Sequence, residues 1–188
     1  LAHLVAESKP YADFYRREVE RGALVILDNS DFEGFQFAPE DLVDACDAIG
    51  ATELMAPETF RDGKKTAHQV LKFAEKVKHT NPDIKIFGTA HGGPKIEFFD
   101  CWTELMNSDL VDTIGVSCRF DVVLRRTLRS PSPKLQKAYY RIALMKLIDA
   151  ILTSEGMVKA SPKTKPHHLL GATDAIELYQ YRDWPWVR

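Results

Sequence analysis

Two carboxylates and an imidazole follow short apolar runs, at positions where they could carry out proton transfer. Asp28, Glu58 and His91 each come directly or almost directly after such a run. If the runs are parallel strands, the side chains that follow them meet at the carboxyl edge of the sheet, where α/β enzymes hold their active sites. Gly92 comes directly after His91, and the lack of a side chain there would let a ligand approach the backbone. We therefore predict a candidate site from these residues.

Each of these residues also has a simpler explanation. Asp28 could cap the following helix, because Asp is common at helix N-termini. Phe32 and Phe35, which follow in the same loop, could fold back onto the sheet. Glu58 could be solvated, and His91 could bond a neighbouring loop. The joint placement of these residues after successive runs favours a site over these separate explanations.

The elements that must position these residues alternate between strand and helix along the chain. Short apolar runs between turn residues predict strands, and apolar residues at helical spacing predict helices. The predicted strands cover residues 24–27, 51–57, 84–88, 111–116 and 167–171, and the predicted helices cover 2–20 with an interruption at Pro10, 39–49, 66–78, 96–106, 135–152 and 175–179.

Repeated β-α units of about 30 residues indicate an α/β fold. A (β/α)8 TIM-type barrel fits better than an open doubly wound sheet, since no Gly-rich phosphate-binding fingerprint follows any strand. We expect residues 1–188 to form a single domain, with the barrel incomplete at both ends. One further strand is implied before Leu1, and another is entered at Trp186.

Composition excludes several classes of protein. The chain has 188 residues, a formal net charge of −2 and 45% hydrophobic residues, which is ordinary for a globular domain and excludes a strongly basic nucleic-acid binder. Its 3 cysteines show neither zinc-type spacing nor a disulfide framework, so we expect no metal site and a reducing compartment. No run approaches the ~20 apolar residues of a membrane span, and we expect a cytoplasmic protein.

Five motifs in chain order resemble the tRNA-guanine transglycosylase superfamily. Residues 28–33, Asp-Asn-Ser-Asp-Phe-Glu, are similar to the Asp-Asn-Gly-Ala-Phe-Glu element of the phage and bacterial 7-deazaguanine DNA transglycosylases. Residues 55–58 stand where those enzymes carry Leu-Pro-Asp, and residues 86–93 resemble the Phe-Gly-Ile-Val-Gln-Gly-Gly strand end. Residues 113–116 resemble Ile-Gly-Gly-Leu, and residues 168–178 resemble the Tyr-Leu-Met-Gly-Val-Gly-Thr-Pro-Glu-Asp-Leu region.

The resemblance implies an exchange of guanine for a 7-deazaguanine base (similar to preQ0 or preQ1) in nucleic acid, with DNA favoured over tRNA. The reaction would pass through a covalent glycosyl-enzyme intermediate. Asp28 would handle the proton on the exchanged base, and Phe32 would stack on the extruded purine. Glu58 would replace the Asp that binds the Watson–Crick edge, His91 would replace a Gln that binds the exocyclic oxygen, and Gly115 would bring backbone close to the base.

The chain also departs from the family pattern. Ser30 and Asp31 replace two small residues, and the extra carboxylate would repel phosphate. The nucleophilic Asp is expected just beyond Arg188, so residues 1–188 alone should be inactive. The zinc site of the tRNA enzymes would also lie outside this chain, and we expect no cofactor within it. The resemblance allows a homodimer and, for a phage-encoded protein, a location in the host cytoplasm.

Basic residues gather after the fourth predicted strand, where acidic residues are sparse. In a barrel mouth they could bind nucleic-acid phosphates, although a solvated helix face is the simpler explanation. For this role we select Arg119, Arg125, Arg126 and Arg129, and the cluster also includes Lys134, Lys137 and Arg141.

Two other functions remain open at this point. Asp28 and Glu58 could form the carboxylate pair of a glycoside-type hydrolase, which needs the two groups about 5 to 9.5 Å apart. The barrel could also be a non-catalytic binding or structural module, which Asp31 and the Glu58 and His91 replacements would permit.

Overall fold

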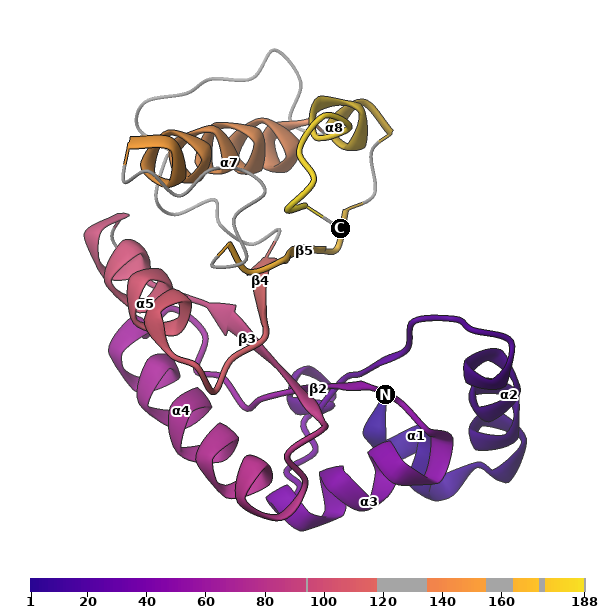
Figure 1. The fold of residues 1–188 in the computed structure, drawn as a ribbon. Coiled ribbons are helices and arrows are strands. Elements are labelled where there is room, and N and C mark those ends of the chain that lie inside the picture. The colour runs from indigo at the N-terminus through magenta and orange to yellow at the C-terminus, as the bar shows by residue number, and fades with distance from the viewer. Residues whose placement is uncertain (94, 118–134, 155–163, 173–174, 188) are drawn as a thin grey trace.

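The structure is a computed structural model that describes residues 1–93, 95–117, 135–154, 164–172 and 175–187. In this part of the chain, five parallel strands form one curled sheet in sequence order, which is half of a barrel (Figure 1). The strands are β1 (Ile26–Leu27), β2 (Glu53–Met55), β3 (Lys85–Ala90), β4 (Thr113–Ser117) and β5 (His167–Leu170). The predicted α/β alternation is thus confirmed.

The sheet continues past β5 at one point. Val187 forms an isolated parallel bridge with His167, whose backbone N–H donates to the carbonyl of Trp186 over 2.6 Å. This contact places the chain end where the strand entered at Trp186 was predicted. At the edge of the sheet, β5 is therefore bridged by one later residue, Val187.

Helices cover the convex side of the sheet, as Figure 1 shows for α3, α4 and α5. The helices are α1 (Ala2–Glu7), α2 (Lys9–Glu20), α3 (Pro39–Ile49), α4 (Gly63–Thr80), α5 (Lys95–Asn107), α7 (Gln136–Ser154) and α8 (Ala175–Gln180), with a short 3-10 helix η1 at Asp31–Glu33. Local signals set several ends. Ser8 separates α1 from α2 and caps α2, Asp62 caps α4 by accepting from the Lys65 backbone, and Gly50 ends α3 in the left-handed conformation. No helix in the described ranges is long and apolar enough to span a bilayer.

Alternation along β3 separates a helix-facing side from a concave side. A side chain at Gly88 would meet Val70 of α4 and Leu105 of α5, so this position faces the helices. On the other side, a side chain at Gly115 would meet the Phe87 ring at 2.5 Å. Because successive residues point to opposite faces, Phe87 and the residues two and four positions later lie on the concave side. The last of these is His91, beyond the end of β3.

The buried side of α7 differs from the prediction. The spacing of apolar residues in the predicted helix 135–152 favours a buried side with Tyr139, Ile142, Leu147 and Ile151, but Tyr139 is 47% exposed. The buried positions are instead Tyr140, Arg141, Leu144, Met145, Ile148 and Leu152. Apolar residues occur around most of this helix, so its pattern did not select a face. An ion pair with Glu177 of α8 draws Arg141 inward.

Candidate functional site

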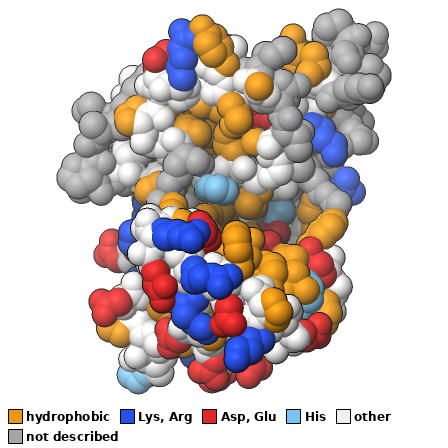
Figure 2. All heavy atoms as spheres, turned by 90° about the vertical axis from the view of Figure 1, so that its right-hand side faces the viewer, with side chains coloured by type: hydrophobic (Ala, Val, Ile, Leu, Met, Phe, Trp, Pro, Cys, Tyr) orange, Lys and Arg blue, Asp and Glu red, His pale blue; other side chains and the backbone are white. Residues whose placement is uncertain are grey.

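A cavity of about 580 Å³ opens at the carboxyl ends of the strands. We call it the strand-end cavity. Its wall brings together Asp28, Phe32, Glu58 and His91, four of the side chains predicted to form the site. Figure 2 shows a recess between two parts of the molecule, with acidic and histidine side chains inside it. The cavity is lined by Asp28, Asp31, Phe32, Glu33, Met55, Glu58, Phe60, His91, Ser117, Leu170 and Gly171.

Asp28 is held by a tight turn at the end of β1. Its Oδ1 accepts a 2.8 Å hydrogen bond from the backbone of Ser30, which is fully buried and has a left-handed φ of 64°. Asn29 ties the same turn to the next strand, because its Nδ2 donates to the carbonyl of Ala56 over 2.9 Å. These bonds fix the carboxylate at the cavity wall. They also show that Asp28 caps its own turn, whereas the residue before α3 is Ala38.

The two loop phenylalanines have different environments. Phe32 is 74% exposed and stands at the strand-end cavity. Phe35 stacks on His3, with ring centroids 4.3 Å apart and planes 4° apart, so it does fold back onto the protein. Of these two rings, Phe32 is the one that lines the cavity, and its stacking on a base stays a prediction.

His91 and Glu58 form a close pair inside the cavity. Nε2 of His91 lies 3.0 Å from Oε1 of Glu58, and the His91 side chain is only 7% exposed. The pair is not aligned as a full hydrogen bond: within the described residues, His91 Nε2 and Glu58 Oε2 are buried without hydrogen-bond partners. Unsatisfied buried polar atoms are rare because each costs about 1–3 kcal/mol. Two of them on one cavity wall indicate a place for a polar ligand.

Glycines and one carboxylate hold the His91 loop in place. Glu97 of α5 accepts from the backbone of Gly63 at 2.9 Å and from the backbone of Gly93 at 3.0 Å. A side chain at Gly92 would lie 2.3 Å from the backbone nitrogen of Phe98. Gly92 therefore has a packing reason to be glycine. It is not among the cavity-lining residues, and its role beside a ligand stays a prediction.

Gly115, in β4, is not among the residues that line the cavity. The Phe87 ring occupies the space that a side chain at this position would need. The proposed approach of the Gly115 backbone to a base also stays a prediction.

Asp31 and Phe60 are two of the cavity-wall residues that were not selected from the sequence. Asp31, in η1, lines the strand-end cavity and a neighbouring cavity of about 480 Å³ that also contacts Glu58. Burial raises the pKa of Asp31, and the charges of Glu58 and Asp28 raise it further, against a backbone hydrogen bond from Glu58 that lowers it. Phe60 stands beside His91, with ring centroids 5.8 Å apart. The sequence signal that could have identified Phe60 as a cavity residue is its position two residues after Glu58.

The predicted phosphate-binding arginines Arg119, Arg125, Arg126 and Arg129 lie outside the described residues, as does Lys134. Arg141 lies within them and is not a surface group. Its side chain is 2% exposed and paired with Glu177, so it cannot contribute to a phosphate-binding surface. Lys137 is exposed on α7.

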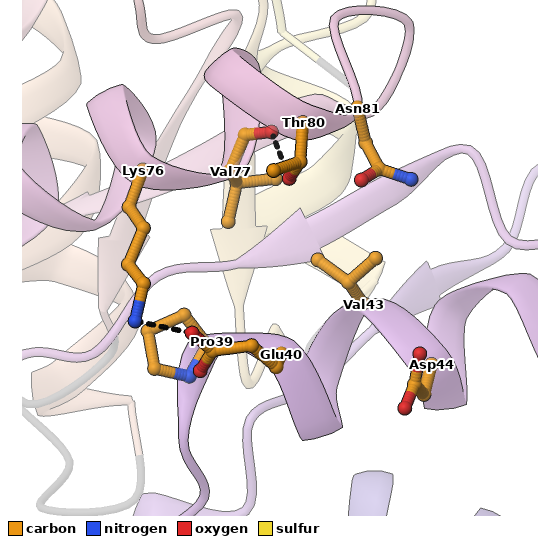
Figure 3. A pocket seen from close by; sticks show the side chains of 8 residues that line it. All are labelled: Pro39, Glu40, Val43, Asp44, Lys76, Val77, Thr80 and Asn81. Atoms are coloured by element: carbon orange, nitrogen blue, oxygen red, sulfur yellow. Dashed lines mark hydrogen bonds and ion pairs between the residues drawn. The ribbon is translucent and has the colours of Figure 1, made fainter.

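Two other kinds of site could occur among the described residues, namely a metal site and a further cavity. No cluster of three or more His, Cys, Asp or Glu there could hold a metal ion. Figure 3 shows a smaller cavity, about 220 Å³, between α3 and α4. Lys76 and Glu40 form an ion pair across it, and none of its lining residues comes from a strand.

The chain was also compared with known proteins. It matches no protein-family model and no curated protein.

Proposed function

We propose that this chain forms the base-binding part of a transglycosylase that exchanges guanine for a 7-deazaguanine base in nucleic acid, with DNA favoured over tRNA. The observation that carries the proposal is the joint position of Asp28, Phe32, Glu58 and His91 on one cavity. A planar base with several N–H donors and a carbonyl matches that wall.

Recognition of the base would use the unpaired polar atoms. Glu58 Oε2 can accept from the N–H donors of a guanine-like edge, and His91 Nε2, as a donor tautomer, can bond the exocyclic oxygen. Phe32 would stack on the face of the base. A single ligand would thus satisfy the atoms that the protein leaves without partners.

Asp28 would carry the proton of the exchange. Attack of a carboxylate on the anomeric carbon breaks the glycosidic bond, and guanine leaves with a proton donated by Asp28. The incoming base returns a proton to Asp28 and then displaces the enzyme carboxylate. In this proposal the nucleophile follows Arg188, and the half-barrel belongs to a (β/α)8 barrel, which is supported by the strand order and the Val187 bridge.

The charge of the cavity supports a base, not a phosphate, as its occupant. Asp28, Asp31, Glu33 and Glu58 all line it, and none of its described lining residues is Lys or Arg. A phosphate group would be repelled by these carboxylates.

The test is incorporation of a radiolabelled 7-deazaguanine base into duplex DNA and, separately, into tRNA by the full-length protein. Asp28→Asn keeps the shape of the side chain and should abolish incorporation, whereas Asp47→Asn, on the exposed side of α3, should not change it. Absence of label in both substrates with the unaltered protein would refute the proposal.

A second candidate function is glycoside hydrolysis by the carboxylates. It is favoured by the shared position of Asp28, Asp31 and Glu58 on one cavity wall, where burial raises the pKa of Asp31, because glycosidases use one carboxyl group as a general acid beside a second one. Release of nitrophenol from nitrophenyl furanosides, lost in Asp31→Asn, would support it. No release above buffer would exclude it.

A further inference from the structure

An exposed aromatic and arginine pair stands at the rim of the strand-end cavity, in the loop between β2 and α4. Phe60 lines the cavity and is 46% exposed. The guanidinium carbon of Arg61 lies 5.0 Å from the centre of the Phe60 ring, a cation–π distance. An exposed Phe at a cavity rim loses hydrophobic stabilisation unless a ligand covers it.

The backbone at this pair is held in an unfavourable conformation. Arg61 has a φ of 65°, in the left-handed region that residues with a side chain rarely adopt. Neighbouring bonds fix the loop on both sides: Thr59 exchanges two hydrogen bonds with Thr66, at 3.0 and 2.9 Å, and Glu97 accepts from Gly63. The loop thus presents Phe60 and Arg61 in one orientation, and such strain is typical of functional sites.

We propose that Phe60 and Arg61 hold the nucleotide that flanks the extruded one, with Phe60 stacked on its base and Arg61 bonded to its phosphate. This inference rests on the proposed function, because it needs a nucleic-acid strand at the cavity. The acidic wall keeps phosphates out of the cavity, so the phosphates beside an extruded nucleotide must lie at the rim. An arginine and an exposed ring are the groups that bind phosphate and unpaired bases there.

The two residues would act by different physics, which gives them separate signatures. Stacking depends little on salt, so loss of Phe60 should weaken binding at all ionic strengths. A phosphate contact releases counterions, so loss of Arg61 should lower the slope of log affinity against log salt by about 0.9. A purely structural role for Arg61 would leave that slope unchanged.

The experiment uses the full-length protein and a fluorescent DNA duplex with one target guanine flanked by 2-aminopurine. Phe60→Ala should weaken binding, measured by anisotropy, between about 5-fold and about 150-fold, and should change the 2-aminopurine signal of the complex. Arg61→Gly removes the side chain and relieves the strained φ, so the variant should fold at least as well and still show the lower salt slope. Matched controls on and after α2 are Phe14→Ala, whose ring is 49% exposed, and Arg21→Ala, whose side chain is 71% exposed.

The outcomes separate this inference from the proposed function. Arg61→Gly should bind the free 7-deazaguanine base as the unaltered protein does, since Arg61 is not among the residues that line the strand-end cavity. Unchanged DNA binding by Phe60→Ala and Arg61→Gly, in a protein that binds DNA and exchanges the base, overturns the rim contact alone. Loss of free-base binding in Arg61→Gly also overturns it. If the unaltered protein neither binds nucleic acid nor exchanges the base, the proposed function fails and this inference fails with it.

Discussion

The buried ion pair between α7 and α8 offers a stringent test of the structure. Arg141 donates to both oxygens of Glu177, with Nη2 to Oε2 at 2.7 Å, and each side chain is 2% exposed. Tyr181 donates its hydroxyl to Oε1 at 3.2 Å. Burial and the Glu177 charge raise the pKa of Tyr181, so it stays protonated. The change to test is Glu177→Ala.

Removing Glu177 leaves the Arg141 guanidinium buried without its counter-charge. Breaking a buried pair from one side costs about 3–5 kcal/mol, a large part of the roughly 5–15 kcal/mol that holds a domain together. For a domain of this size, each kcal/mol lowers the midpoint of thermal unfolding by about 2–4 °C, so a fall of roughly 6–20 °C is expected. Arg141 Nη1 also donates to the carbonyl of Leu170, which lines the strand-end cavity, and ligand binding there should weaken.

The assay is urea and thermal unfolding of the single variant and of the double variant Arg141→Met with Glu177→Leu. The double variant replaces the whole pair by apolar groups of similar volume, so it should recover most of the lost stability. A loss below about 1 kcal/mol for Glu177→Ala would refute the buried geometry, since a loss that small is typical of an exposed pair.

Three smaller predictions concern a carboxylate, a glycine and a histidine. Because the pKa of Asp31 is raised, the native state binds the proton of this carboxyl group more tightly than the unfolded state does. The free energy of unfolding therefore falls as pH rises above the ordinary pKa of Asp. In urea unfolding, Asp31→Asn should stabilise the protein at pH 7 and not at pH 3. Gly92→Ala should destabilise by about 1–3 kcal/mol, because the added carbon meets fixed backbone. Burial lowers the pKa of His167 from 6.5 to about 4. The free energy of unfolding should therefore fall by about 3 kcal/mol as the pH drops from 6.5 to 4. Urea midpoints measured from pH 7 to pH 4 check this prediction.

Each of these predictions has a control or a contrary result. Equal midpoints for Asp31→Asn and the unaltered protein at pH 7 would contradict the raised pKa of this half-buried carboxyl group. Gly93→Ala is the control for Gly92→Ala, since the nearest atoms to its added carbon lie 3.5 Å away. His167→Gln should remove the pH dependence assigned to this residue, and a dependence that persists unchanged would have another source.

The sequence predicted the strand and helix order because buried parallel strands are apolar on both faces. Boundaries were less predictable. β1 begins at Ile26, two residues later than expected, and Leu24 is 55% exposed. α4 begins at Gly63, ahead of the predicted Thr66, because Asp62 caps the helix while the residues between carry no apolar period.

The site was predictable to the extent that strand ends converge. The positions after strands identified Asp28, Glu58 and His91, whose backbone direction follows from the fold. Asp31 and Phe60 were not selected, because their approach to the cavity depends on loop conformation. The buried state of Arg141 depends on Glu177, which lies 36 residues away in the chain, and no local pattern reports such a partner.

The Glu97 carboxylate joins two loops that are far apart in sequence, one at the start of α4 and one after β3. Because its two oxygens hold the amides of Gly63 and Gly93, neither amide can be released to solvent by a movement of Glu97 without freeing the other. Both amides should therefore exchange with deuterium at linked rates, as one cooperative opening unit. The loop before α4 and the loop after His91, which both lie beside the strand-end cavity, would then open together.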